Sequence, residues 1–247
     1  MSDNEKSAAE TEPGNPQHIA VILDGNRRFA KKLMLKPWMG HEWGRKKVEK
    51  LLDWAVELGV KELTLYAFSV DNFNRPKEEF DFIMQLFREA CKQLRNDPRL
   101  QEKGKKLGIR IRFLGRIDMF PADIGKSMRE LMDKTKDNTG LIVNFCMAYG
   151  GRQEIIDAAR KMVADVEKGR ISGKDISEEM FKHYLYSPGE PEIVIRTGGD
   201  KRTSNFLIWQ SNYSEWFFLE KFWPEFEKED LVQVIKEYKQ RHRRFGR

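Results

Sequence analysis

Short apolar segments that alternate with helix-like segments are the feature of this 247-residue chain that most limits its fold. Five of them read HIAVIL (18–23), ELTLYAF (62–68), IRIRFL (109–114), LIVNFC (141–146) and EIVI (192–195). Apolar runs of this length are typical of buried strands, and the stretches between them carry apolar residues at helical spacing. The alternation predicts a single α/β domain with a central, mostly parallel sheet flanked by helices.

Two of the expected helices end at glycines. One helix carries Val48, Leu51 and Ala55 on one face and stops before Gly59, and another spans residues 155–166 and stops before Gly169. Glycine is common directly after a helix because it adopts the left-handed backbone conformation that closes the last turn.

A third expected helix, residues 78–94 (EEFDFIMQLFREACKQL), is apolar around nearly its whole circumference. Such a helix must bury more than one face. Taken alone, the segment is explained by a central core helix or a dimer contact more readily than by a ligand-binding wall.

Outside the core pattern, we expect residues 1–17 to be a flexible leader and residues 18–247 to form the domain, with a basic C-terminal tail. The leader is acidic and polar and unlike a signal peptide, and no apolar stretch is long enough to cross a bilayer, which predicts a cytoplasmic protein. Cys91 and Cys146 lie far apart and are expected to be buried thiols. The net charge of +6 arises mostly in the tail, so a nucleic-acid partner is not indicated.

Polar loops follow four of the five expected strands. They read DGNRR (24–28), SVDNFNR (69–75), YGGR (149–152) and RTGGDKRTS (196–204). In a parallel sheet these loops meet at one edge, where arginine forks and glycine backbone N–H groups bind phosphate oxygens. The sequence therefore predicts a phosphate or diphosphate site at the carboxyl edge of the sheet.

Asp24 directly follows the first strand and has two interpretations. It is either the N-cap of the next helix or a ligand of Mg²⁺, which proteins usually bind through one or two carboxylates together with substrate phosphates. Neither a GK[ST] phosphate loop nor GxGxxG occurs in the chain, which disfavours nucleoside triphosphates and dinucleotides. With the apolar helix 78–94, the loops favour a substrate that has a charged head and an apolar tail.

Several long motifs of the chain resemble the cis-prenyltransferases, the family of undecaprenyl diphosphate synthase. They are HIAVILDGNRRFAKK, GHEWG, TLYAFSVDNFNRP, NFCMAYGGR, IRTGGDKRTSNFLIWQSNYSEWFF and WPEF, and they extend from His18 to about Pro224. The resemblance implies a homodimer with a hydrophobic tunnel. It also implies a Mg²⁺-dependent enzyme that condenses isopentenyl diphosphate repeatedly onto an allylic prenyl diphosphate, giving a long-chain polycis-polyprenyl diphosphate such as undecaprenyl diphosphate, a precursor of lipid carriers for glycan synthesis.

The resemblance also implies roles for the residues that match the family's motifs. Asp24 and Glu215 correspond to the metal site, Asn26, Ser69 and Asn72 to further catalytic positions, and Leu141 to the tunnel floor. Gly25, Asn26, Arg27, Arg28, His41, Phe73 and Arg75 correspond to the allylic site, with Ser69, Asn72, Phe73 and Arg75 on a mobile loop. Arg196, Arg202 and Ser204 correspond to the isopentenyl diphosphate site, and Arg244 and Gly246 to an RxG motif that acts on the partner subunit.

Alternatives stay open at this point. The form GNRRFAKK is closer to archaeal and eukaryotic members, so both farnesyl and geranylgeranyl diphosphate remain candidates for the starter. A trans-type prenyltransferase is disfavoured because the chain has no Asp-Asp pair. A non-catalytic partner subunit, which would have lost the metal site, is disfavoured by the presence of Asp24, Asn26, Arg196, Arg202 and Glu215. The basic tail is either the RxG motif, a solvated tail or a contact with anionic lipid.

Overall fold

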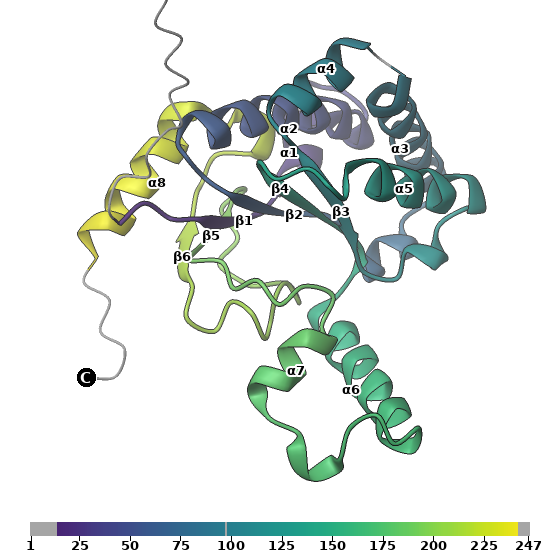
Figure 1. Ribbon diagram of the computed structural model, residues 1–247. Coiled ribbons are helices and arrows are strands. Elements are labelled where there is room, and N and C mark those ends of the chain that lie inside the picture. The colour runs from purple at the N-terminus through teal and green to yellow at the C-terminus, as the bar shows by residue number, and fades with distance from the viewer. Residues whose placement is uncertain (1–13, 97, 242–247) are drawn as a thin grey trace, which may run out of the picture.

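Residues 14–96 and 98–241, which the computed structural model describes, contain a six-stranded parallel sheet with helices on both faces (Figure 1). The strands are β1 (His18–Ile22), β2 (Glu62–Ser69), β3 (Arg110–Leu114), β4 (Ile142–Tyr149), β5 (Ile193–Arg196) and β6 (Glu215–Phe218). Their order is β3-β4-β2-β1-β5-β6, and all neighbours run parallel. The predicted α/β fold is confirmed.

Helices cover the sheet unequally. They are α1 (Asn26–Lys32), α2 (Gly40–Glu57), α3 (Lys77–Asn96), α4 (Pro98–Lys106), α5 (Ala122–Thr135), α6 (Gly151–Glu167), α7 (Glu178–Tyr184) and α8 (Lys228–Gln240). Short 3-10 turns are η1 (Pro37–Met39), η2 (Val70–Asn74), η3 (Ile117–Met119), η4 (Gly173–Asp175) and η5 (Trp223–Glu225). In Figure 1, α2, α3, α5 and α8 lie on one face, whereas α6 and α7 project from the other.

The predicted helix ends are confirmed. Gly59 and Gly169 follow α2 and α6 with φ angles of 74° and 67°, in the left-handed region. Both cysteines are buried and free, and burial raises the pKa of the Cys91 thiol to about 11.

The core explains why β1 reads as an uninterrupted apolar run. Ile19 and Val21 belong to a buried cluster with residues of α2 and α8, whereas Ala20 and Ile22 pack on the opposite side with Phe206. A parallel sheet covered on both faces buries every residue of its central strands.

Two features of the chain differ from the expected organisation. β6 was not among the five expected strands, because its four residues, EWFF, are not an aliphatic run like that of β5. Residues 1–13 lie outside the described part of the chain, but the end of the expected leader packs on the domain: Asn15 donates a hydrogen bond to the Leu58 carbonyl at 2.7 Å, and Pro16 is buried.

The sheet order positions the site. The chain leaves β1 towards β2 on one side and later returns to β5 on the other side of β1. Such a change of direction leaves a crevice at the carboxyl ends of the central strands. The loops after β1 and β5 are therefore neighbours.

Candidate active site

Asp24 lies beside Arg196 at the carboxyl ends of β1 and β5. Ile22 and Arg196 are register partners, and Asp24 follows two residues after Ile22. The Arg196 guanidinium donates to Asp24 Oδ2 at 2.8 Å, and the Gly25 N–H donates to Oδ1 at 2.6 Å. Gly25 is itself the N-cap of α1, so the N-cap interpretation of Asp24 is wrong. Its φ is 104° and a Cβ would lie 2.8 Å from the Phe222 ring, so the turn requires glycine.

A second carboxylate, that of Asp200, contacts the same group of arginines. Arg28 Nη2 lies 3.3 Å from Asp24 Oδ1 and 3.2 Å from Asp200 Oδ2. Arg202 donates to both oxygens of Asp200 at 3.0 and 2.9 Å. Two carboxylates and the guanidiniums of Arg28, Arg196 and Arg202 thus form one network, the Asp24 cluster.

The predicted isopentenyl diphosphate residues come together in this network. Arg196 Nη1 donates to Ser204 Oγ at 2.7 Å and also to the Arg202 carbonyl. Arg196 is buried, whereas Arg202 is exposed. The three residues therefore present one anchored and one accessible guanidinium on the same side of the crevice. Asp200 was not named as a site residue from the sequence, although it lies between Arg196 and Arg202 in the loop RTGGDKRTS.

Glu79 gathers three of the side chains predicted for the allylic site. Its carboxylate accepts a hydrogen bond from Arg75 at 2.6 Å and lies 3.4 Å from His41 Nε2 and 3.6 Å from Arg27 Nη2. The Glu79 side chain is only 1% exposed. The hydrogen bond with His41 and the charges of Arg75 and Arg27 lower the pKa of Glu79 although burial opposes this, and burial lowers the pKa of His41.

This group, the Glu79 cluster, was missed in the sequence because Glu79 belongs to the apolar helix. The signal that could have revealed it is the four-residue spacing of Arg75 and Glu79, at which opposite charges in or next to a helix can form an ion pair.

The predicted mobile loop closes one side of the crevice. The Ser69 N–H donates to Asn72 Oδ1 at 3.1 Å, and the two residues form a capping box for η2. Ser69, Asn72 and Arg75 line the cavity described below. Phe73 instead packs against Phe68 at a ring distance of 5.1 Å, so it supports the loop from the apolar side.

Asn26, the first residue of α1, is half-buried. Its Nδ2 donates to the Leu23 carbonyl at 3.0 Å, whereas its Oδ1 is buried without a hydrogen-bond partner among the described residues. A Cβ on Gly44 would lie 2.3 Å from this oxygen, so glycine at position 44 makes room for the amide. Asn26 lines both cavities of the site.

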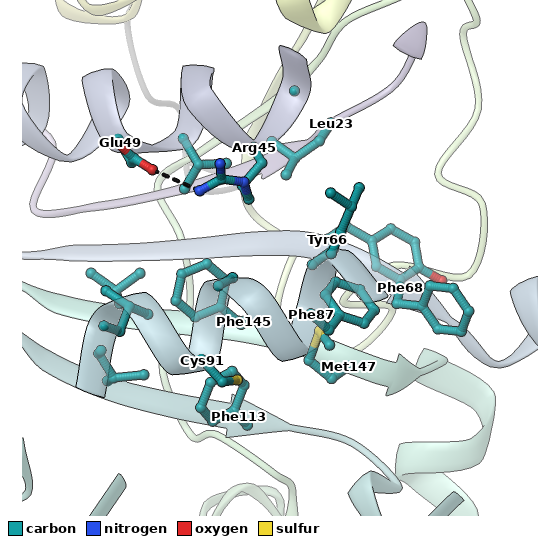
Figure 2. A pocket seen from close by; sticks show the side chains of 18 of the residues that line it. Leu23, Arg45, Glu49, Tyr66, Phe68, Phe87, Cys91, Phe113, Phe145 and Met147 are labelled. Atoms are coloured by element: carbon teal, nitrogen blue, oxygen red, sulfur yellow. Dashed lines mark hydrogen bonds and ion pairs between the residues drawn. The ribbon is translucent and has the colours of Figure 1, made fainter. Parts of the chain in front are cut away.

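Two cavities meet at these clusters. The first, of about 400 Å³, is lined mainly by charged residues, including Asp24, Arg27, Arg28, Asp200 and Arg202. The second, of about 530 Å³, begins at Asp24, His41, Ser69, Arg75 and Arg196 and extends between α2, α3, α5 and the sheet, where its walls are apolar. Figure 2 shows Phe87, Phe113, Phe145 and Met147 around this second cavity. The structure thus has one charged and one apolar cavity, as expected for a substrate that has a charged head and an apolar tail.

The apolar helix 78–94 corresponds to most of α3, and its side chains face both the core and the larger cavity. Ile83 and Met84 pack in a buried cluster with Met128 of α5, while Phe87 and Leu94 line the larger cavity. The helix is therefore both part of the core and a wall of the cavity.

A polar bridge interrupts the apolar wall. Arg45 of α2 donates to Glu49 at 3.1 Å and to Gln93 of α3 at 2.9 Å, and all three line the larger cavity. Figure 2 shows the Arg45–Glu49 pair among apolar side chains. No motif or spacing in the sequence had indicated this bridge.

Glu215 is not brought to Asp24. It begins β6 and pairs in register with Ile193 at the start of β5, whereas the Asp24 cluster lies beyond the ends of these strands. Its carboxylate accepts a hydrogen bond from Arg241 at 2.6 Å. Within one chain, Glu215 is therefore not placed to share a metal ion with Asp24, because it lies at the opposite edge of the sheet.

Leu141 is buried but does not itself line the larger cavity. Val143, Phe145 and Met147, which alternate with it on the same face of β4, do line it. Leu141 is thus the next side chain on that face, just beyond the end of the cavity.

Arg244 and Gly246 of the predicted tail motif lie outside the described residues.

The fold and the site define a class: a parallel α/β protein with a charged cavity at its strand ends and an apolar cavity beneath its helices. Residues 22–246 match the family described as putative undecaprenyl diphosphate synthase. A tritrans,polycis-undecaprenyl-diphosphate synthase (geranylgeranyl-diphosphate specific) of Thermococcus kodakarensis is 48% identical over 234 residues, which cover 94% of this chain and 87% of the relative.

Two solved structures agree with this assignment. Lavandulyl diphosphate synthase from Lavandula x intermedia, in complex with dimethylallyl diphosphate, has a TM-score of 0.86 at 32% identity and covers 96% of this chain and 100% of its own. A probable undecaprenyl diphosphate synthase from Campylobacter jejuni has a TM-score of 0.76 at 32% identity and covers 94% and 99%. The chain belongs to the undecaprenyl diphosphate synthase family of cis-prenyltransferases and is a prenyl transferase.

In the described part of the chain, none of the helices is both long and apolar enough to cross a membrane.

Proposed function

We propose that this chain, with Mg²⁺, adds isopentenyl diphosphate repeatedly to an allylic prenyl diphosphate and forms a long-chain polycis-polyprenyl diphosphate. The observation that carries the proposal is the continuity of the two cavities through Asp24, Asn26, His41 and Arg75. A cationic cavity that opens into an apolar one fits a substrate with a diphosphate head and a hydrocarbon tail. Membership of the family supports the reaction class.

Geranylgeranyl diphosphate is the proposed starter, in preference to farnesyl diphosphate. The support is the relative from Thermococcus kodakarensis, whose name specifies geranylgeranyl diphosphate and which is 48% identical over 94% of this chain. By the same comparison, the proposed product is an undecaprenyl diphosphate.

Each of the two clusters would bind a different diphosphate. Arg27, His41 and Arg75 of the Glu79 cluster, with the Gly25 turn, would hold the allylic diphosphate, and Arg196, Arg202 and Ser204 would hold isopentenyl diphosphate. Guanidiniums at the first site stabilise the charge that develops on the departing diphosphate. The apolar walls of the larger cavity exclude water from the allylic carbon while the double bond of isopentenyl diphosphate attacks it.

Asp24 is the residue that would hold Mg²⁺. Among the described residues, no group of three or more His, Cys, Asp or Glu side chains could enclose a metal ion. A single rim carboxylate still fits Mg²⁺, because this ion commonly uses one or two carboxylates and takes its other ligands from substrate phosphates and water. When bound, Mg²⁺ supplies charge neutralisation for the diphosphate.

Asn26 would orient the reacting groups and would not act as a base. Its neutral amide has no basic lone pair on nitrogen, but its buried Oδ1 can accept a hydrogen bond. Ser69 and Asn72, whose backbone and side chain cap η2, would hold the loop over the same centre.

A homodimer remains part of the proposal. Its support is an exposed apolar row on α6, formed by Ile156, Val163 and Val166, on the helix that projects from the sheet in Figure 1. The proposed action of Arg244 and Gly246 on a partner subunit concerns residues outside the described part of the chain.

One assay tests the proposal against a non-catalytic partner subunit. The purified chain alone is incubated in detergent with Mg²⁺, labelled isopentenyl diphosphate and either starter, and the products are separated by chromatography. We expect long-chain products, with kcat/KM at least about tenfold higher for geranylgeranyl than for farnesyl diphosphate. Absence of incorporation with both starters would identify a subunit that needs another chain, and equal kcat/KM values would remove the starter preference.

A further inference from the structure

Exposed apolar side chains gather where α1 ends and α2 begins. Leu33, Met34, Met39 and Trp43 are all exposed, with Met34 at 95% and Trp43 at 50%. Phe29 joins them, because its ring lies 5.8 Å from that of Trp43 in an edge-on arrangement. These five residues form the α1–α2 patch.

The backbone displays this patch to the outside. Met34 has a φ of 56°, in the left-handed region that methionine rarely adopts. The turn is held by a hydrogen bond from the Leu35 N–H to the Ala30 carbonyl at 2.9 Å, and Ala30 is buried. The fold therefore fixes a large apolar side chain where it contacts little protein, and exposed apolar clusters of this kind mark interaction sites.

The charge around the patch selects its partner. Between Arg27 and Lys46 the chain carries seven Lys or Arg residues and one acidic residue, Glu42. Lys36 lies over the Trp38 ring at 5.2 Å and Lys46 over the Trp43 ring at 6.0 Å. Tryptophan and lysine side chains that surround exposed aliphatic residues are the combination that occupies the boundary between lipid headgroups and acyl chains.

Most of this charge is already paired, because Arg27, Arg28 and Arg45 belong to the ion pairs described above. Lys32 forms an ion pair with Glu225 at 2.6 Å, and Lys46 forms one with Glu42 at 3.0 Å. Lys31 and Lys36 take part in none of these pairs and leave the patch with an excess of positive charge. An anionic surface is therefore the electrostatic complement of the patch.

The patch also adjoins the charged cavity. Arg27, Arg28, Lys31 and His41, which come from the same segment of the chain, line that cavity. We propose that the α1–α2 patch docks on an anionic lipid bilayer, with Leu33 and Met34 inserted at the headgroup boundary and the charged cavity next to the membrane surface. The docking does not depend on which prenyl diphosphate the enzyme uses.

Vesicle binding of the full-length chain tests this. Vesicles of phosphatidylcholine alone and of phosphatidylcholine with phosphatidylglycerol are sedimented with the protein at low and high salt. We expect binding to the anionic vesicles, weakened by salt, and a partition coefficient at least about tenfold lower for the Leu33→Ser/Met34→Ser variant. The matched control is Met119→Ser/Val232→Ser, which removes two exposed apolar side chains elsewhere and should bind like the wild type.

Several results would overturn the proposal. They are no binding, equal binding to neutral and anionic vesicles, and unchanged binding of the Leu33→Ser/Met34→Ser variant. Binding that this variant keeps but that deletion of residues 242–247 abolishes would assign the membrane contact to the tail. A change in the variant's molecular mass in solution would show that a second copy of the chain covers the patch.

Prenyl transfer in detergent separates this proposal from the proposed function. Neither Leu33 nor Met34 lines a cavity, so we expect the variant to retain wild-type turnover there. Loss of the vesicle binding with intact turnover supports the docking. If the wild type bound anionic vesicles but catalysed no transfer, the docking would stand while the proposed function failed.

Discussion

The carboxylate of Glu79, which is 1% exposed, accepts a hydrogen bond at 2.6 Å from Arg75, four residues before it. Arg75 Nη1 also lies 3.0 Å from His41 Nε2, so one buried acid sets the position of two side chains from different segments. The end of the site proposed for the allylic diphosphate is thus built around a residue that need not touch the substrate.

Replacement of Glu79 by glutamine should damage both stability and binding. The change leaves Arg75 and Arg27 without their shared anion, and removal of one partner from a buried ion pair costs about 3 to 5 kcal/mol. We expect urea unfolding to show a loss of that order, and the KM for the allylic diphosphate to rise. Glu78→Gln, an exposed neighbour, is the control, and equal effects of the two changes would contradict a special role for Glu79.

Asp24→Ala should abolish turnover while the fold stays intact. The carboxylate lies at the rim, and its partners Arg196 and Arg28 keep other contacts with Ser204 and Asp200. We expect kcat to fall more than about tenfold, a loss above about 1.4 kcal/mol in the transition state.

Asp200→Ala is the comparison for Asp24, because Asp200 contacts the same arginines. We expect its kcat to stay within about threefold of the wild type, a change below about 0.7 kcal/mol. If Asp24→Ala kept more than a tenth of wild-type kcat, or if both variants lost activity equally, Asp24 would not be the magnesium ligand.

Alanine variants of Arg196 and Arg202 should differ in how strongly they impair KM and kcat. Arg202 is exposed and mainly holds Asp200, so Arg202→Ala should raise the KM for isopentenyl diphosphate without loss of fold. Arg196 is buried and joins Asp24 to Ser204, so Arg196→Ala should raise this KM and also lower kcat. Steady-state kinetics with varied isopentenyl diphosphate measures both, and an unchanged KM in the two variants would place that diphosphate elsewhere.

Leu141→Ala should lengthen the product. The side chain continues the face of β4 that lines the larger cavity, so its removal extends the space beyond Val143. A buried leucine replaced by alanine also costs about 2 to 5 kcal/mol of stability. Chromatography of the products separates the two effects, because a role in packing alone predicts destabilisation at unchanged chain length.

His18 should make stability depend on pH. Burial lowers its pKa below the usual 6.5, although the charges of Glu62 and Glu192 and a backbone contact at Glu190 act in the opposite direction. The unfolded chain therefore binds a proton that the folded chain does not, so the free energy of unfolding decreases as pH falls below about 6.5 towards the folded pKa.

Urea unfolding of the wild type and His18→Gln between about pH 7.5 and pH 5 measures this contribution. The variant should show a smaller decrease, because glutamine does not titrate and can still bond to Thr64, the partner of His18. His183→Gln, at an exposed position, is the control and should follow the wild type. Identical slopes for His18→Gln and the wild type would contradict the prediction.

Strand positions were predictable because short, uninterrupted apolar runs bounded by polar loops are typical of strands buried on both faces of a sheet. β1 to β5 follow these runs within a few residues. β6 was not predictable in the same way, because EWFF (215–218) lacks the uninterrupted aliphatic residues that indicated the equally short β5.

The site was predictable where it depends on the ends of strands and was not where it depends on packing. Asp24 and Arg196 follow from the rule that parallel strands share one carboxyl edge. Glu215 does not lie beside Asp24 within one chain, and the sequence could not indicate this, because a motif does not reveal whether its acid begins or ends a strand. The contacts of Glu79 with Arg27 and His41, and of Arg45 with Gln93, were not predictable, because no sequence spacing encodes the distance between helices. Only the partners four residues away, Arg75 and Glu49, could have been inferred from spacing.

The Asp24 cluster has a consequence for how an anion can bind there. Arg28, Arg196 and Arg202 already share the oxygens of Asp24 and Asp200. A diphosphate that binds these guanidiniums has to displace the carboxylates of Asp24 and Asp200. Its affinity is therefore the difference between two similar charge-assisted interactions. Added salt screens both sides of such an exchange, so binding should depend on ionic strength less steeply than at a cluster of uncompensated cations. The exchange would also release the Asp24 carboxylate from its arginines as the diphosphate binds. The carboxylate would then be free to bind Mg²⁺ just when the diphosphate supplies the second ligand of the ion.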